Sequence, residues 1–198
     1  MLAFPDLGPA CERFEPYTQP DTCNPDAQLG VKAFRDWVIG NLGGTDLGIV
    51  RACDIGSTSL HHEGRAWDWG VNVSKPDDVV RVQQLFDWLL ATDKYGNEAA
   101  MFRRAGLTSM IWNRQSWSTV YKQWKPYTRP NPHTDHVHFS FGWPGARGQT
   151  SFYSWASGGL LPGPPIPVAP AYNKLGYVLI TGAAIYLTYP YLRKLLTR

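Results

Sequence analysis

The chain has 198 residues, which is enough for one core domain of ordinary size and an appendage. The formal net charge is only +3, with no basic field of the kind that nucleic-acid binding requires, so nucleic acid is excluded as a partner class. Aromatic residues make up 14% of the chain, including nine tryptophans, and these provide ample material for a hydrophobic core.

The N-terminal segment, residues 1–26, is rich in proline, aspartate and cysteine and is predicted to be an irregular arm. It lacks the basic start and the apolar run of a signal peptide. Three cysteines, Cys11, Cys23 and Cys53, are an odd number, so at least one is unpaired within the chain. Cys23 and Cys53 each flank an apolar segment and could form a disulfide; alternatively, all three are reduced. None has zinc-ligand spacing with another.

The next segment, residues 27–157, is predicted to be a domain of fold class α+β, in which helices flank a small antiparallel sheet. Apolar residues at helical spacing predict a helix over Leu29–Leu42, ended by Gly43. The other elements are predicted in chain order as a strand over Leu47–Cys53, a strand from Ala66, a helix starting near Ser74, a short helix over Glu98–Ala105, a strand over Leu107–Trp112, a loop over Gln115–Pro132 and a strand over His136–Phe141.

The five histidines lie in two short clusters, at 61–62 and 133–138, and each cluster is accompanied by an aspartate, Asp68 or Asp135. Both strands nearby alternate with a period of two, so one face of each is aromatic and the other polar. Asp68 and His138 occupy polar faces. If the two strands are neighbours, these side chains can therefore meet over one metal ion. The alternative is two polar strand faces with chance histidines.

Asp68 and His138 are therefore candidate ligands, and the cluster at 61–62 can supply a second imidazole, from His61. Two imidazoles and one carboxylate from distant parts of a chain are what a catalytic Zn²⁺ site uses, and three protein ligands leave a fourth position for water. The sequence therefore predicts a zinc centre at these residues. His62 is the alternative ligand if the register of the loop differs.

The motif around these ligands resembles a known family. Zinc D-Ala-D-Ala peptidases, which belong with lysostaphin-type endopeptidases and the zinc domain of hedgehog proteins, share the signature Ser-x-His-x-x-Gly-x-Ala-x-Asp and, far downstream, acid-x-x-His. The second pattern is matched here by Asp135-His136-Val137-His138. The residues around both patterns are especially similar to those of actinobacterial and phage wall-associated domains. The resemblance covers about Thr22–Trp155. The first pattern is matched by Ser59, His61, Gly64, Ala66 and Asp68.

The resemblance implies that His61, Asp68 and His138 are the zinc ligands, and it implies roles for further residues. Asp135 corresponds to the general base, although strand parity alone would turn it away from the metal face. His136 is assigned to oxyanion stabilisation, or else to support of the site. Arg51 resembles the arginine that binds the substrate carboxylate; alternatively, it forms an ordinary surface salt bridge. Ser59 resembles the serine that hydrogen-bonds substrate; alternatively, it only caps the loop. His133 lines the cleft or, as the favoured interpretation, is exposed to solvent.

The C-terminal segment has a different composition. Five prolines between Gly158 and Pro170 predict a semi-rigid linker over residues 158–174. Leu175–Leu192 carries no charge and as a helix would span roughly 27 Å, close to the thickness of a bilayer core. A transmembrane helix in contact with membrane lipid is therefore predicted there, followed by a basic tail over 193–198. The alternative is a helix that packs on the domain or binds a partner.

The function expected from the resemblance is that of a membrane-anchored zinc metallopeptidase that hydrolyses amide bonds in the peptides of peptidoglycan. Both a phage lytic enzyme and a bacterial wall-remodelling enzyme are consistent with this function. The enzyme could act as an endopeptidase, a D,D-carboxypeptidase or a dipeptidase. A basic tail without an export signal fits a protein of a virion membrane or of the host cell membrane, with virion or membrane proteins as partners. The alternative is a zinc-binding structural or binding protein that keeps the fold without using the activity, such as a virion component.

Overall fold

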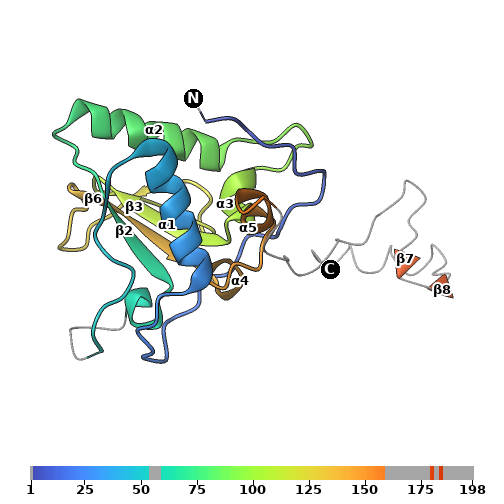
Figure 1. Cartoon of the computed structure of the whole chain (residues 1–198), viewed down its shortest axis with the longest axis horizontal. Coiled ribbons are helices and arrows are strands. Elements are labelled where there is room, and N and C mark those ends of the chain that lie inside the picture. Colours follow the sequence, from blue (N-terminus) through green and yellow to red (C-terminus); the bar gives the residue numbers. More distant parts are fainter. Residues whose placement is uncertain (1, 54–58, 159–178, 181–182, 185–198) are drawn as a thin grey trace, which may run out of the picture. The chain divides into compact units, whose positions relative to one another are not determined.

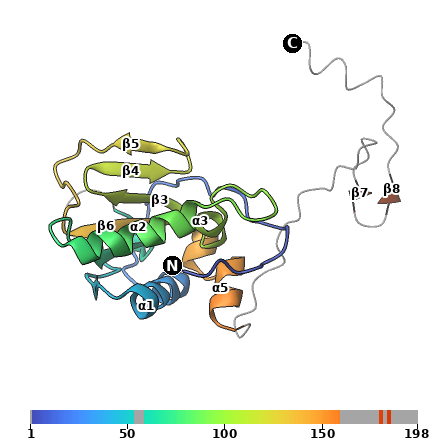
Figure 2. The ribbon, with the colours of Figure 1, turned by 90° about the horizontal axis from the view of Figure 1, so that it is seen from above.

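The computed structural model describes residues 2–53, 59–158, 179–180 and 183–184 (Figure 1). The chain divides into two units, Met1–Ile166 and Pro167–Arg198. The first unit is built on one six-stranded sheet in the order β1-β2-β6-β3-β4-β5, in which all neighbouring strands are antiparallel (Figure 2). Its strands are β1 (Thr45–Asp46), β2 (Ala66–Gly70), β3 (Leu107–Trp112), β4 (Gln115–Ser118), β5 (Trp124–Pro126) and β6 (His136–Phe141).

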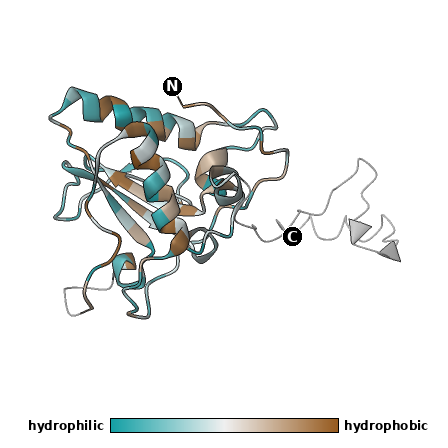
Figure 3. Cartoon of the chain, viewed as in Figure 1, coloured by the Kyte–Doolittle hydropathy of each residue, from teal (hydrophilic) through white to brown (hydrophobic). Residues whose placement is uncertain are grey.

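Helices α1 (Leu29–Leu42) and α2 (Pro76–Leu90) pack on the face of the sheet that carries the aromatic side chains. The other helices are the 3-10 helix η1 (Leu60–Glu63), α3 (Ala100–Arg104), α4 (Trp143–Ala146) and α5 (Ser151–Ala156). Hydrophobic and hydrophilic residues alternate along α1 and α2, as expected of helices with one buried face (Figure 3). The predicted bounds of α1, β3 and β6 are confirmed.

The core forms where α1 meets the central strands. Phe34 of α1 is fully buried, and its ring lies 6.2 Å from that of Trp67 on β2 and 5.4 Å from that of Phe139 on β6. The rings meet edge-on, the arrangement that aromatic pairs favour over a face-to-face sandwich. Because Trp67 and Phe139 point to this side, their strand neighbours Asp68 and His138 point to the other side of the sheet, away from α1.

The sheet is larger than the sequence predicted. The loop predicted over Gln115–Pro132 contains β4 and β5, which form a hairpin on the outer edge of β3. These strands are only four and three residues long, too short for a clear alternation of polar and apolar residues. The strand predicted over Leu47–Cys53 is also wrong: β1 occupies Thr45–Asp46, and the chain beyond it is held to β2 by isolated hydrogen bonds, such as that from the Leu47 N–H to the Asp68 carbonyl.

The second unit corrects the predicted membrane helix over Leu175–Leu192. Its described residues form two short strands, β7 (Leu179–Ile180) and β8 (Ala183–Ala184), which pair antiparallel, whereas a continuous helix cannot contain such a pair. Three of the four residues from Val178 to Thr181 are β-branched, a composition that favours strand over helix. Throughout the described ranges, no helix has the length and apolar character needed to cross a membrane. The rest of that span, the linker beyond Gly158 and the basic tail lie outside the described residues.

Candidate metal centre

Three side chains predicted as ligands come together on the open face of the sheet. Asp68 of β2 and His138 of β6 are directly opposed in the antiparallel ladder, and His61 reaches them from η1, which lies just before β2. One ligand atom from each residue lies within 4.8 Å of the others, so the three side chains could hold one metal ion. Strand register therefore brings together residues that are 70 positions apart in the chain.

The spacing of the ligand atoms suits tetrahedral coordination. His61 Nε2 lies 3.3 Å from His138 Nδ1 and 3.3 Å from Asp68 Oδ2, and His138 Nδ1 lies 2.8 Å from Asp68 Oδ1. A tetrahedral ion with bonds of about 2.0–2.1 Å keeps its ligand atoms roughly 3.3 Å apart. The donor set thus fits a Zn²⁺-sized ion with only small movements of the side chains.

The outer nitrogen of each histidine is held by a second group. His61 Nδ1 lies 2.8 Å from the Ile49 carbonyl oxygen, which can only accept, so this nitrogen carries the proton and Nε2 presents its lone pair to the triad. His138 Nε2 lies 3.2 Å from Ser140 Oγ, which leaves Nδ1 to face Asp68. Such outer contacts fix the ring orientation and the tautomer of metal ligands.

The electrostatics of the triad favour a charged Asp68 carboxylate beside a neutral His138 imidazole. Burial acts to raise the pKa of Asp68, but the contacts with His138 and His61 outweigh it and hold the pKa well below its usual range. Burial also lowers the pKa of His138, against the opposing effect of Asp68. Asp68 is therefore ionised and His138 neutral near pH 7, the protonation states in which both bind metal.

Asp135 and His136 lie beside the triad as a pair. Asp135 stands just before β6, so it escapes the strand parity that would have turned it away. Its Oδ1 accepts a hydrogen bond of 2.7 Å from His136 Nδ1, and His136 Nε2 lies 3.8 Å from Asp68 Oδ1. The Asp135 side chain is 70% exposed, whereas His136 is buried. The contact made by this pair with the triad therefore runs through His136.

His133 is the residue that the sequence interpretation undervalued. It is buried rather than exposed, and its ring lies 4.7 Å from that of His136 and 5.9 Å from that of His138. Its Nδ1 lies 2.9 Å from the Asn131 carbonyl, and its backbone has a φ of 51°. Burial lowers the pKa of His133 to about 4, helped by the neighbouring histidines. His133 thus adds a neutral imidazole to the lining of the site, and only its spacing from His136 in the sequence hinted at this.

The other predicted site residues are placed as follows. Arg51 is half exposed, and its Nη2 lies 4.0 Å from Asp68 Oδ2, so its guanidinium borders the triad. Ser59 Oγ accepts a hydrogen bond from the His61 N–H and so caps η1. His62 is buried next to the ligand His61 but is not part of the triad. Glu63 has a structural role: its Oε2 is in a buried ion pair with Arg65, and its Oε1 accepts hydrogen bonds from Asp21 and Thr22.

Gly64 explains why this motif has glycine three residues after its first ligand. It ends η1 with a φ of +62°, and a Cβ at this position would lie 2.0 Å from the Asp26 carbonyl oxygen. Glycine is therefore required both by the left-handed backbone and by the close approach of the N-terminal arm. The fixed end of η1 in turn sets the direction in which His61 enters the site.

The substitution Gly64→Ala is expected to lower the free energy of unfolding by about 2–5 kcal/mol, because backbone strain and overpacking add together. Gly96→Ala is the matched control: Gly96 also has a positive φ, of +84°, but a Cβ there meets nothing within 4 Å. It should cost only about 1–2 kcal/mol. Urea unfolding of both variants measures the difference, and equal losses would contradict the assigned contact with Asp26.

A disulfide links the N-terminal arm to the edge of the site. Cys23 and Cys53 are bonded across a separation of 30 residues, while Cys11 is free. Of the two alternatives that the sequence left open, pairing is thus the one found. The bond ties down the segment that carries Arg51, two residues before Cys53, and closing such a loop restricts the unfolded chain.

Comparison with known proteins identifies one family. Neither the curated proteins nor the solved structures yield a match to this chain. A family model described as the C-terminal domain of VldE matches residues 23–138, which is more than half of the chain. The matched region begins at the disulfide residue Cys23 and ends at His138, so it contains the whole triad. The chain therefore belongs to the VldE C-terminal domain family.

Proposed function

We propose that His61, Asp68 and His138 bind Zn²⁺ and that the domain is a zinc-dependent peptidase acting on amide bonds in peptidoglycan peptides. The observation that carries the proposal is the triad itself, with near-tetrahedral spacing and with His61 turned to offer its Nε2 lone pair. Bound Zn²⁺ would supply a Lewis acid and activate water as a nucleophile near neutral pH. The resemblance of the sequence to zinc D-Ala-D-Ala peptidases supports the choice of bond and substrate.

The chain's own groups supply the remaining chemistry. The Asp135–His136 pair is proposed to accept the proton of the attacking water and to return it to the leaving amine, with Asp135 holding the tautomer of His136 that keeps Nε2 towards the triad. His136 can then also donate to the oxyanion when it is protonated. The exposed guanidinium of Arg51 is a suitable partner for a carboxylate of the peptide substrate.

The place of action is proposed to be an oxidising compartment or the outside of a cell. The Cys23–Cys53 bond supports this, because disulfides persist in such environments and are rare in the reducing cytosol. Peptidoglycan lies in the same surroundings, so the substrate and the disulfide are mutually consistent.

The experiment that tests the function is a digestion of purified peptidoglycan with the zinc-loaded protein. New amino and carboxyl termini should appear, and their masses identify the bond that is cut. Chelation should stop the reaction and added Zn²⁺ should restore it. If the zinc-loaded protein produces no new termini from peptidoglycan or from its free peptides, the peptidase proposal fails. A zinc-binding structural or binding protein then becomes the better description.

A further inference from the structure

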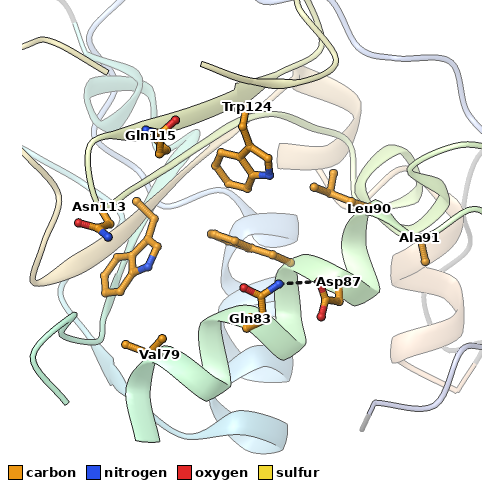
Figure 4. Close-up of a pocket in the computed structure, with 10 residues that line it drawn as sticks. Val79, Gln83, Asp87, Leu90, Ala91, Asn113, Gln115 and Trp124 are labelled. Atoms are coloured by element: carbon orange, nitrogen blue, oxygen red, sulfur yellow. Dashed lines mark hydrogen bonds between the residues drawn. The ribbon is translucent and has the colours of Figure 1, made fainter. Parts of the chain in front are cut away.

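A groove lies on the side of the sheet opposite to the triad. It has a volume of about 520 Å³ and opens between α2 and the end of the sheet formed by β3, β4 and β5 (Figure 4). Pockets for small ligands have volumes of about 300–1,000 Å³. Trp112 lines the groove and shares its strand face with Met110, which is paired with the core residue Phe139. Since His138 points the other way, the groove is separate from the metal centre.

Aromatic side chains form the walls of this groove. Phe86 of α2 and Trp124 of β5 have ring centroids 5.1 Å apart, and Trp112 of β3 also lines the groove. Trp124 is 38% exposed although it is a large apolar side chain on a short edge strand. Exposure of the apolar indole surface to water is energetically unfavourable. The exposed position of this tryptophan is explained if a ligand covers it.

Planar polar groups line the same groove between and around the rings. Gln83 and Asp87 project from α2, where Gln83 Nε2 donates to Asp87 Oδ1 over 2.7 Å (Figure 4). Asn113 of the β3–β4 turn and Gln115 of β4 line the groove as well. Carboxamides both donate and accept hydrogen bonds, whereas a carboxylate only accepts. The ten lining residues include one acid and no basic side chain, so the groove suits a neutral ligand rich in hydroxyl and amide groups.

We propose that this groove binds a short, neutral oligosaccharide that carries N-acetyl groups. The C–H faces of a pyranose ring can stack on the exposed indole of Trp124, in the way that aromatic side chains bury flat apolar surfaces. Asp87 accepts from ring hydroxyls and repels anionic ligands, while Asn113 and Gln115 match the donor and acceptor of an acetamido group. The choice of N-acetylated sugars rests on the proposed action on peptidoglycan.

The consequence for the domain is a second point of attachment to the same polymer. With the saccharide held on one face of the sheet and the triad on the other, the groove anchors the domain to a glycan strand while the triad meets peptides nearby. Attachment of this kind raises the effective concentration of substrate without any new contact at the reacting bond.

The test is a titration of the purified protein with the β-1,4-linked tetramer of N-acetylglucosamine, followed by tryptophan fluorescence and calorimetry. Saturable binding is expected. Trp124→Ala should weaken it about tenfold or more, and Gln115→Ala should weaken it without touching the aromatic walls. Tyr121→Ala is the matched control, because Tyr121 is also an exposed aromatic residue close to β5 but does not line the groove. The melting temperature of each variant confirms that it is folded.

The outcomes separate this inference from the proposed function. Asp135→Asn, which alters only the metal side, should bind the tetramer as the wild type does. If the tetramer shows no saturable binding, or if Trp124→Ala and Tyr121→Ala bind it equally, the inference is overturned, while peptide cleavage can still be measured. If a peptidoglycan peptide without sugar competes for the groove and the tetramer does not, the groove is a peptide site and the inference is equally overturned.

Discussion

His138→Ala is expected to abolish zinc binding. The wild-type protein should contain about one zinc per chain, and the variant close to none. A site with only three protein ligands binds zinc too weakly when one of them is removed. The loss should also appear as a fall in the unfolding midpoint of the variant, to that of wild-type protein treated with a chelator, since metal bound only to the folded state adds its binding energy to stability. Elemental analysis and thermal unfolding are the two measurements.

The matched control is His133→Ala. His133 is also buried and its ring neighbours that of His138, but it is not one of the three residues whose ligand atoms converge. Its replacement should leave the zinc content unchanged while removing a similar volume from the same region. Equal zinc in both variants, whether both keep it or both lose it, would contradict the assignment of the ligands.

Strong local patterns predicted the parts of the fold that hold the triad. The apolar spacing over Leu29–Leu42 and the alternation over His136–Phe141 each extend far enough to fix an element and its buried face. Once the faces were fixed, the parity of Asp68 and His138 placed both on the side away from the core, where the ladder pairs them. Asp68 and His138 could therefore be predicted from periodicity, whereas His61 lies on η1 and was assigned from the resemblance of its motif.

The remaining features depend on tertiary contacts that leave little trace in the sequence. The backbone φ of 51° at His133 is set by its hydrogen bonds with Asn131, so neither its burial nor its place beside His136 follows from a pattern. The β4–β5 hairpin is too short for its period to be read. The uncharged stretch Leu175–Leu192 showed that the segment is long and apolar, but it did not fix the conformation. Two paired strands lie where a helix was predicted.

The placement of Asp135 shows most clearly how structure changes a mechanistic assignment. The sequence resemblance gave this residue the role of general base by itself. Its carboxylate is instead exposed and bound to His136 Nδ1, and the imidazole, not the carboxylate, stands 3.8 Å from the triad. Acid–base work is therefore assigned to the two residues together: a carboxylate that fixes the tautomer, and an imidazole that faces the reacting atoms.

Asp135→Asn should consequently keep its zinc and its unfolding midpoint but lower kcat by about 100-fold or more, as expected when a positioned proton acceptor is lost. The change is isosteric, so substrate affinity should be little affected and the loss should fall on kcat rather than KM. His136→Ala should give a similar loss. The double variant should be hardly slower than either single one, since residues that act as a unit are not additive.

The rates of peptide release from peptidoglycan measure these effects, with the exposed Asp77→Asn on α2 as a control that should match the wild type. A steep loss in Asp135→Asn together with a normal rate in His136→Ala would contradict the pair and return the proton transfer to Asp135 alone. A wild-type rate in Asp135→Asn would remove the residue from the mechanism. Because Glu63 is already committed to Arg65, the acid–base role would then have to pass to His136 or His133, the imidazoles that line the site.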